Sequence, residues 1–158
     1  MPNCSKGSSG RRSITAATDL PDVNVWVALS TPDHPMRPAA ARYWREASAP
    51  NFAFSRVTAL GLVRVVSSPT HFGGRSLDPA DAWRAYAIWR LRPEVHLFEE
   101  PPHCDSLIEE WIHKGLVTAR TWTDAYLAAF ALSSGFRLVT FDQDFGRFPG
   151  LDRLTLIH

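Results

Sequence analysis

The sequence predicts an α/β fold in which a mainly parallel central sheet lies between two layers of helices. Strand-like and helix-like segments alternate along most of the 158 residues, and this order is typical of parallel sheets. The strand-like segments are almost wholly apolar and lack polar alternation, as expected of strands that are covered on both faces. A chain of this length fits one domain with a sizeable core.

The first 18 residues differ in composition from the rest of the chain. They read MPNCSKGSSGRRSITAAT and contain a basic pair with no apolar segment after it. This pattern predicts a flexible leader and not a signal peptide. We therefore expect a leader over residues 1–18 and one folded domain over residues 19–158.

Composition and charge indicate an ordinary soluble globular protein, with 45% hydrophobic and 21% charged residues. The formal net charge of +1 excludes a global basic field, so binding to nucleic acid would depend on a local patch. No apolar run approaches the roughly 18 residues of a membrane span. Cys4 and Cys104 are too few for a disulfide framework, which favours a cytoplasmic location.

The first half of the domain has two strand-like stretches, each followed by a helix-like one. In chain order we expect a strand-like start and a helix over 19–30, a helix over 33–50, a strand over 51–55 and a helix over 58–68. Thr58 is the expected N-cap of the last helix, with Leu60, Val63 and Val66 on one face.

The second half continues the alternation. We expect a helix over 77–91, a strand over 95–98, helices over 105–115 and 123–135, and strands over 136–141 and 154–158. The helix over 77–91 has the clearest start, because Asp78 can cap it and Pro79 suits its first position. Gly135 is the expected stop of the helix over 123–135.

Several acids lie where a predicted strand ends or a helix begins. Asp22 closes the first strand-like segment, and Asp142 and Asp144 follow the strand over 136–141. Asp124 lies in the first turn of its helix, after Thr123 as the expected N-cap. Because ligands of open parallel sheets bind beyond the carboxyl ends of the strands, we expect these acids to converge there.

A cluster of carboxylates is unfavourable on its own. Two carboxylates about 4 Å apart repel by about 4 kcal/mol at an effective dielectric constant of about 20, so the cluster needs a cation or retains a proton. Mg²⁺ and Mn²⁺ prefer oxygen ligands, and beside a phosphodiester such an ion can activate water and stabilise the leaving oxygen. The arrangement therefore predicts a divalent-metal site for phosphodiester chemistry.

Each acid also has a purely structural explanation. Asp124 suits the dipole of a first helical turn, Asp142 and Asp144 suit a turn after a strand, and Asp22 suits a helix cap. We assign the other acids of this kind to caps and loops: Asp19, Asp33, Asp78, Asp81 and Asp105. The metal-site hypothesis therefore depends on the joint arrangement of the acids.

Three segments carry a resemblance to a known family. They read PDVNVWVAL near the start of the domain, TDAYLAAFA about a hundred residues later and LVTFDQDFGRFPGL near the end. From about Leu20 onward the chain resembles the PIN-domain ribonucleases, above all the VapC toxins of VapBC toxin–antitoxin pairs. The resemblance implies a PIN-like three-layer α/β/α fold and an Mg²⁺- or Mn²⁺-dependent endoribonuclease that cleaves RNA phosphodiester bonds. It also implies a homodimer and a VapB antitoxin that holds the enzyme inactive.

The resemblance assigns roles to residues by their positions. It implies three catalytic and metal-holding acids, one accessory metal ligand and two supporting polar residues. In that order they are Asp22, Asp124 and Asp142, then Asp144, then Asn24 and Thr140.

One position departs from the pattern of the family. Many PIN nucleases carry a glutamate on the helix after the second strand, where this chain has Ala59. The change removes a ligand, so we expect one well-held metal ion and at most a weak second one. Two arginines flank Ala59 and a third precedes the acidic helix start, and all three are candidates for contact with RNA phosphates: Arg56, Arg64 and Arg120.

Two other functions remain open from the sequence. A PIN-like domain that lost catalysis with its glutamate would only bind RNA or an antitoxin, and titration with Mn²⁺ would distinguish this case. An α/β phosphatase or phosphotransferase with a nucleophilic aspartate usually needs a D-x-D motif, whereas Asp22-Val23-Asn24 has an asparagine in the last position.

Overall fold

The computed structural model describes residues 17–69 and 76–157. The strands are β1 (Thr18–Pro21), β2 (Asn51–Phe54), β3 (Val95–Leu97), β4 (Arg137–Thr140) and β5 (Arg153–Thr155). The helices are α1 (Val23–Ser30), α2 (Arg37–Glu46), α3 (Arg56–Val66), α4 (Pro79–Arg90), α5 (Cys104–His113) and α6 (Trp122–Ser134), and a short 3-10 helix, η1 (Gln143–Arg147), follows β4. β1 begins at Thr18, the last residue of the predicted leader, and residues 1–16 of that leader lie outside the described residues.

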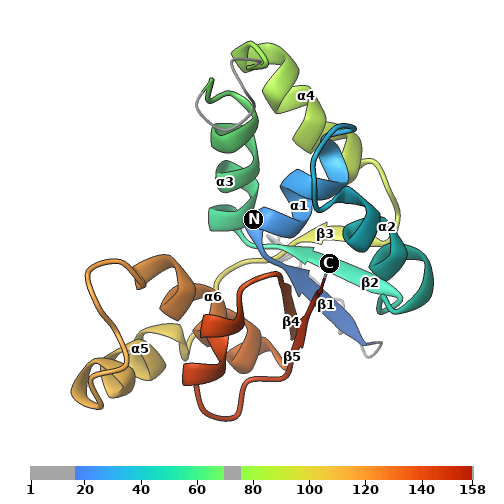
Figure 1. Cartoon of the computed structure of the whole chain (residues 1–158). Coiled ribbons are helices and arrows are strands. Elements are labelled where there is room, and N and C mark those ends of the chain that lie inside the picture. The colour runs from blue at the N-terminus through green and yellow to red at the C-terminus, as the bar shows by residue number, and fades with distance from the viewer. Residues whose placement is uncertain (1–16, 70–75, 158) are drawn as a thin grey trace, which may run out of the picture.

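The five strands form one parallel sheet in the order β3-β2-β1-β4-β5 (Figure 1). Every pairing is parallel, for example Leu20 with Leu138 and Phe54 with Leu97. The predicted α/β class is therefore confirmed. The chain passes from β1 to β2 on one side and places β4 on the other side of β1. The strand order therefore changes side between β1 and β4. Open α/β sheets bind ligands beyond the carboxyl ends of the two strands at such a point.

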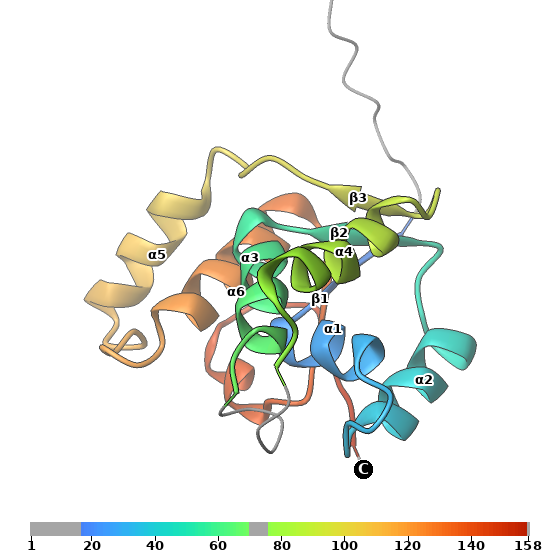
Figure 2. The same cartoon turned by 90° about the horizontal axis from the view of Figure 1, so that it is seen from above.

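Helices cover both faces of the sheet, which gives the expected three layers (Figures 1 and 2). One buried cluster joins Leu20, Ala53 and Leu138 of the strands to α5 and α6. The other joins Phe52, Phe54 and Val139 to α1, α3 and α4. Neighbouring strand residues face opposite layers, as the two-residue period of a strand requires.

Aromatic packing fixes α1 on the sheet directly after the first candidate acid. The fully buried Trp26 ring stacks on Phe54, with ring centroids 4.0 Å apart. At the start of α1, Gly61 of α3 allows close approach of the two helices, since a Cβ at this position would overlap the Val23 side chain. Both contacts hold the start of α1, and so Asp22, against the rest of the fold.

Two predicted helix starts are wrong by a few residues. The N-cap of α3 is Ser55, whose hydroxyl accepts from the Thr58 N–H at 3.1 Å, while the Thr58 hydroxyl accepts from the Ser55 N–H. Thr58 is therefore the reciprocal half of a capping box. Before α6, Thr121 occupies the N-cap position and Thr123 lies inside the helix. The predicted Asp78 cap and Gly135 stop are confirmed.

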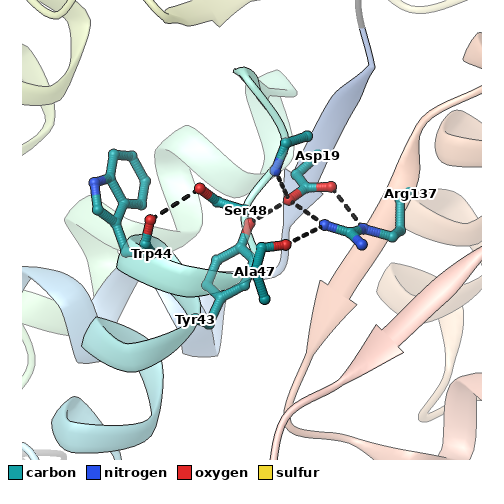
Figure 3. A network of polar contacts seen from close by, with 7 residues as sticks. Asp19, Tyr43, Trp44, Ala47, Ser48 and Arg137 are labelled. Atoms are coloured by element: carbon teal, nitrogen blue, oxygen red, sulfur yellow. Dashed lines mark hydrogen bonds and ion pairs between the residues drawn. The ribbon is translucent and has the colours of Figure 1, made fainter.

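Asp19 is not the cap or loop residue that the sequence predicted. It lies fully buried in β1 and accepts hydrogen bonds from both Arg137 Nε at 2.8 Å and the Tyr43 hydroxyl at 2.7 Å (Figure 3). The Ala49 N–H also donates to it. This network lies at the amino ends of β1 and β4, so it fastens the edge of the sheet opposite to the candidate site.

Two further observations concern the environment of the chain. No helix among the described residues is long and apolar enough to span a membrane. Cys104 is buried as a free thiol at the start of α5. Cys4 lies outside the described residues.

Candidate active site

Asp22 lies directly beyond the carboxyl end of β1 and is the N-cap of α1. Its backbone N–H donates to the Val139 carbonyl at 2.8 Å, which ties it to neighbouring β4. Its Oδ1 accepts from the Val23 N–H at 2.6 Å. The capping explanation of Asp22 is thus correct. The cap also fixes the carboxylate beyond the carboxyl ends of β1 and β4.

Thr140, the last residue of β4, connects the two sides of the site. Its buried hydroxyl donates to Asp22 Oδ2 at 2.9 Å. The same oxygen accepts from the Asn24 side-chain amide at 3.3 Å and from the Asp142 N–H at 3.0 Å. Thr140 therefore holds three of the residues that the sequence proposed for the site.

Asn24 has one polar atom that these contacts do not satisfy. Its Oδ1 is buried and has no hydrogen-bond partner among the described residues. Because the Thr140 proton goes to Asp22, Thr140 requires the donor end of the Asn24 amide, and this leaves Oδ1 free to accept. A buried orphan acceptor beside Asp22 calls for a donor or a cation from outside the chain.

Asp124 and Asp142 approach the same site from other elements. Asp124 lies in the first turn of α6, and Asp142 follows β4 and caps η1, with Oδ1 accepting from the Asp144 N–H at 2.8 Å. Asp124 and Asp142 both act electrostatically on Asp22, and Asp142 also acts on Asp124. The three acids thus share one electrostatic environment.

Burial and the neighbouring acids both shift the pKa values of Asp22 and Asp124. Burial raises the pKa of Asp22 to about 6, and repulsion from Asp124 and Asp142 adds to this, against the stabilising hydrogen bonds from Thr140 and Val23. Burial also raises the pKa of Asp124, and repulsion from Asp142 acts in the same direction. A nearby positive charge would stabilise the ionised form of these acids.

The three carboxylates lie at one edge of the sheet but do not form a compact set of metal ligands. No group of three or more His, Cys, Asp or Glu side chains in the described segments is close enough to hold a metal ion. The local hydrogen bonds explain this spread, since Asp22 and Asp142 each cap the helix that follows them. Mutual repulsion favours the same separation.

Asp144 and Arg147 form an ion pair at the rim of the site. Arg147 contacts Asp144 Oδ2 at 2.9 Å and donates from Nε to the Asp144 carbonyl, also at 2.9 Å. The positive charge of Arg147 also acts on Asp124 and partly opposes the rise of its pKa that burial and Asp142 cause. Arg147 was not among the residues predicted from the sequence, although its spacing of three residues from Asp144 is typical of an ion pair within a helical turn.

The other candidate positions, Ala59 and the three arginines, differ in burial and in their distance from the acids. Ala59 is buried in the core cluster on the α1, α3 and α4 side of the sheet, so apolar packing surrounds the position where the resemblance led us to look for a glutamate. Arg56 is the exposed first residue of α3, at the carboxyl edge of the sheet. Arg64 lies in the last turn of the same helix, about 12 Å further along its axis. Arg120 is exposed in the turn before α6, close in sequence to Asp124.

The chain matches known proteins over most of its length. The PIN-domain family profile matches residues 20–151. Ribonuclease VapC41 of Mycobacterium tuberculosis is 34% identical over 141 residues, which are 84% of this chain and 94% of that protein. Ribonuclease VapC39 of the same organism is 33% identical over 129 residues, 79% of this chain and 88% of that protein.

Solved structures share the fold at lower sequence identity. VapBC2 from Rickettsia felis, bound to a promoter DNA fragment, has a TM-score of 0.65 and 18% identity and covers 89% of this chain and 99% of that one. Mycobacterium tuberculosis VapC20, a toxin that cleaves the sarcin–ricin loop, has a TM-score of 0.62 and 20% identity over 81% of this chain and 92% of that one. The acids beyond a five-stranded parallel sheet, the family profile and the VapC relatives agree, and the chain belongs to the PIN-domain family as a VapC-type ribonuclease.

Proposed function

We propose that this VapC-type ribonuclease cleaves RNA at the carboxyl edge of its sheet, with a divalent metal ion that Asp22, Asp124 and Asp142 share partly through bridging water. The observation that carries the proposal is the grouping of these acids at one edge of the sheet, where burial raises the pKa values of Asp22 and Asp124 and repulsion from neighbouring acids adds to the rise. They come from three distant segments, so chance local capping does not explain their grouping. The phosphatase alternative loses support, because the chain belongs to a nuclease family.

The donor atoms suit Mg²⁺ or Mn²⁺. They are carboxylate oxygens and the orphan amide oxygen of Asn24, and hard divalent cations prefer oxygen ligands. Asp22, Asp124 and Asp142 would hold the ion directly or through water, and when bound it would supply positive charge for the attacking and leaving oxygens. Asn24 Oδ1 is suited to accept a hydrogen bond from a water molecule in the same site.

The side chains around the acids have separate tasks. Thr140 fixes the orientation of Asp22 and stabilises its charged form by donating to Oδ2. Asp124 orients the attacking water, and its raised pKa suits it to accept a proton. Asp144 holds Arg147 in the ion pair at the rim, so we assign it the positioning of that cation and place it outside the metal ligands. Arg56 and Arg120 are exposed near the same edge and are suited to contact RNA, Arg120 through its phosphates.

We further propose that the protein acts in the cytoplasm as a homodimer that a VapB-type antitoxin neutralises. Support for the antitoxin comes from the relatives, since several solved structures of the same fold are VapBC complexes. A cytoplasmic RNA substrate agrees with the free thiol of Cys104.

Incubation of the purified protein with total RNA tests the cleavage proposal. We expect cuts with Mg²⁺ or Mn²⁺, none with EDTA, and none with the Asp22→Asn or Asp142→Asn variants while circular dichroism stays native. Asp105→Asn is the matched control, because Asp105 is an exposed first-turn acid of α5 that lies outside the site. Full activity in both Asp22→Asn and Asp142→Asn would refute the proposal.

A binding module without catalysis is the second candidate, and the burial of Ala59 is the observation that favours it. The apolar packing at this position leaves the site one acid short of the common family pattern. In that case the protein would bind RNA or an antitoxin but leave RNA intact at every metal concentration.

A further inference from the structure

A pocket opens beside the acidic site, at the carboxyl ends of β2 and β3. Its volume is about 440 Å³, and its lining consists of Arg56, Leu97, Phe98, Glu99, Glu100 and Tyr126. Tyr126 lies on α6 two residues after Asp124, and Arg56 begins α3 directly beyond β2. The pocket and the acids therefore share one edge of the sheet and one helix.

The strand order determines how far apart the two sites lie. Asp22 follows β1, β1 neighbours β2, and β2 neighbours β3. Neighbouring strands are about 5 Å apart, so β3 lies roughly 10 Å from β1. A base that flanks the scissile phosphate of a single strand of RNA can span this distance.

Aromatic rings form the apolar part of the pocket. The Phe98 N–H donates to the Phe54 carbonyl at 2.9 Å, and the Phe98 ring packs edge to face on Phe136 with centroids 4.9 Å apart. The half-buried Tyr126 ring packs on Phe130. Unstacked RNA bases are commonly held on such rings, and the stacking is sequence-tolerant by itself.

Polar groups of both kinds complete the pocket. The Glu100 carboxylate interacts with the Tyr126 hydroxyl inside the pocket. The Tyr126 and Glu100 side chains therefore lie next to each other in the lining of the pocket. Arg56 and Glu99 are exposed at the rim. Glu100 is exposed as well, and the pocket presents its carboxylate as an acceptor and the Arg56 guanidinium as a donor.

This combination matches one base better than the others. Guanine has two adjacent donors, N1–H and the N2 amino group, which a carboxylate can accept together. Its O6 and N7 are the acceptors that arginine binds with two hydrogen bonds. Adenine, cytosine and uracil each present only one such donor group to a carboxylate.

We propose that this pocket binds a guanine base next to the scissile bond, with Glu100 accepting from N1–H and N2 and Arg56 donating to O6 and N7. The inference rests on the proposed ribonuclease function and adds a sequence preference to it. Glu100 and Arg56 are binding residues, and Tyr126 is a positioning residue that acts through Glu100.

Cleavage of randomised single-stranded RNA by the wild-type protein with Mg²⁺ gives the first test. We expect guanine to be enriched at one fixed position beside the cut. The preferred RNA is then remade with inosine, which lacks the N2 amino group, or with 7-deazaguanosine, which lacks N7. Each replacement is expected to lower kcat/KM by about tenfold.

Variants assign each lost contact to a residue. Glu100→Gln should bring the guanosine-to-inosine ratio of kcat/KM close to one and keep the 7-deazaguanosine effect, and Arg56→Gln should do the reverse. Tyr126→Phe keeps the ring and should reduce the inosine effect only in part. Glu109→Gln removes the same charge from the exposed face of α5 and should keep both ratios. A cut site without a fixed guanine, or ratios that Glu100→Gln and Arg56→Gln leave unchanged, would overturn the inference.

A binding measurement separates this inference from the cleavage proposal. Fluorescence anisotropy compares a short oligoadenylate carrying one guanosine with the same strand carrying one inosine, without metal. Tighter binding of guanosine, by about fivefold or more, that Glu100→Gln removes would support the pocket even if the wild-type protein leaves RNA intact. Equal binding of the two strands would reject the pocket even if metal-dependent cleavage is observed.

Discussion

The hydroxyl of Thr140 donates a hydrogen bond to Asp22 Oδ2 at 2.9 Å, across 118 residues of sequence. This bond joins the carboxyl ends of β1 and β4. These are the two neighbouring parallel strands at which the strand order changes from one side of β1 to the other. It also opposes the burial and repulsion that raise the pKa of Asp22. The hydrogen bond from Thr140, the last residue of β4, therefore stabilises the charged form of Asp22.

Removing that hydroxyl should weaken the site without changing its shape. Thr140→Val keeps the volume and loses the donor, so the pKa of Asp22 should rise further and Mn²⁺ affinity at pH 7 should fall by about tenfold or more. Calorimetric titration measures the affinity. Thr140→Ser should restore most of it, and equal affinity in the valine variant would contradict the role of the hydroxyl.

The raised pKa of Asp22 predicts how stability depends on pH. The folded-state pKa is about 6, above the ordinary value of 3.8, so the folded state holds a proton that the unfolded state releases between these values. The contribution to stability is fully present below about pH 4 and is lost as the pH rises through 6. Urea unfolding should show the wild-type protein losing up to about 3 kcal/mol between pH 4 and 7 relative to Asp22→Asn. A constant difference between the two proteins would contradict the shift.

Arg147 should set the protonation of Asp124. Loss of its charge in Arg147→Gln should raise the pKa of Asp124, so the acidic limb of the pH–rate profile for RNA cleavage should move to higher pH. We expect the rate at pH 7 to fall by about tenfold. Arg147→Lys should move the limb partly back, and Arg84→Gln on the exposed face of α4 is the control. An unshifted limb in Arg147→Gln would argue against the role.

The buried ion pair of Asp19 and Arg137 should support the fold and not the chemistry (Figure 3). Asp19→Ala leaves Arg137 and Tyr43 without their shared partner and should lower the free energy of unfolding by about 3 kcal/mol. Asp81→Ala removes an acid from an exposed pair with Arg84 and should change it by less than about 1 kcal/mol. Similar urea midpoints for the two variants would show that the buried network is dispensable.

The sequence predicts best what is decided by near neighbours. The cap at Asp78 and the stop at Gly135 were confirmed, because each depends on the backbone within one turn. The parallel sheet was also confirmed, since apolar runs between helices leave few other arrangements. Asp22 shows that a local and a functional explanation can both hold, because it caps a helix and stands in the acidic cluster.

The errors concern contacts between distant segments or choices between similar neighbours. Asp19 read as a loop residue because its partner Arg137 is 118 residues away. Thr58 read as the cap of α3 because either residue of a capping box looks like the start, and only hydrogen-bond geometry identifies Ser55. The pocket of Arg56, Glu100 and Tyr126 has no sequence signature, because three separate elements meet there.

Titration of the metal-free protein with Mn²⁺ by calorimetry tests the central claim most directly. If Asp22, Asp124 and Asp142 form one site, the wild-type protein and the control Asp105→Asn should bind Mn²⁺ with the same affinity. Each of Asp22→Asn, Asp124→Asn and Asp142→Asn should weaken that binding by at least about tenfold. Binding that survives all three substitutions unchanged, or no binding by the wild-type protein at millimolar Mn²⁺, would contradict a shared metal site.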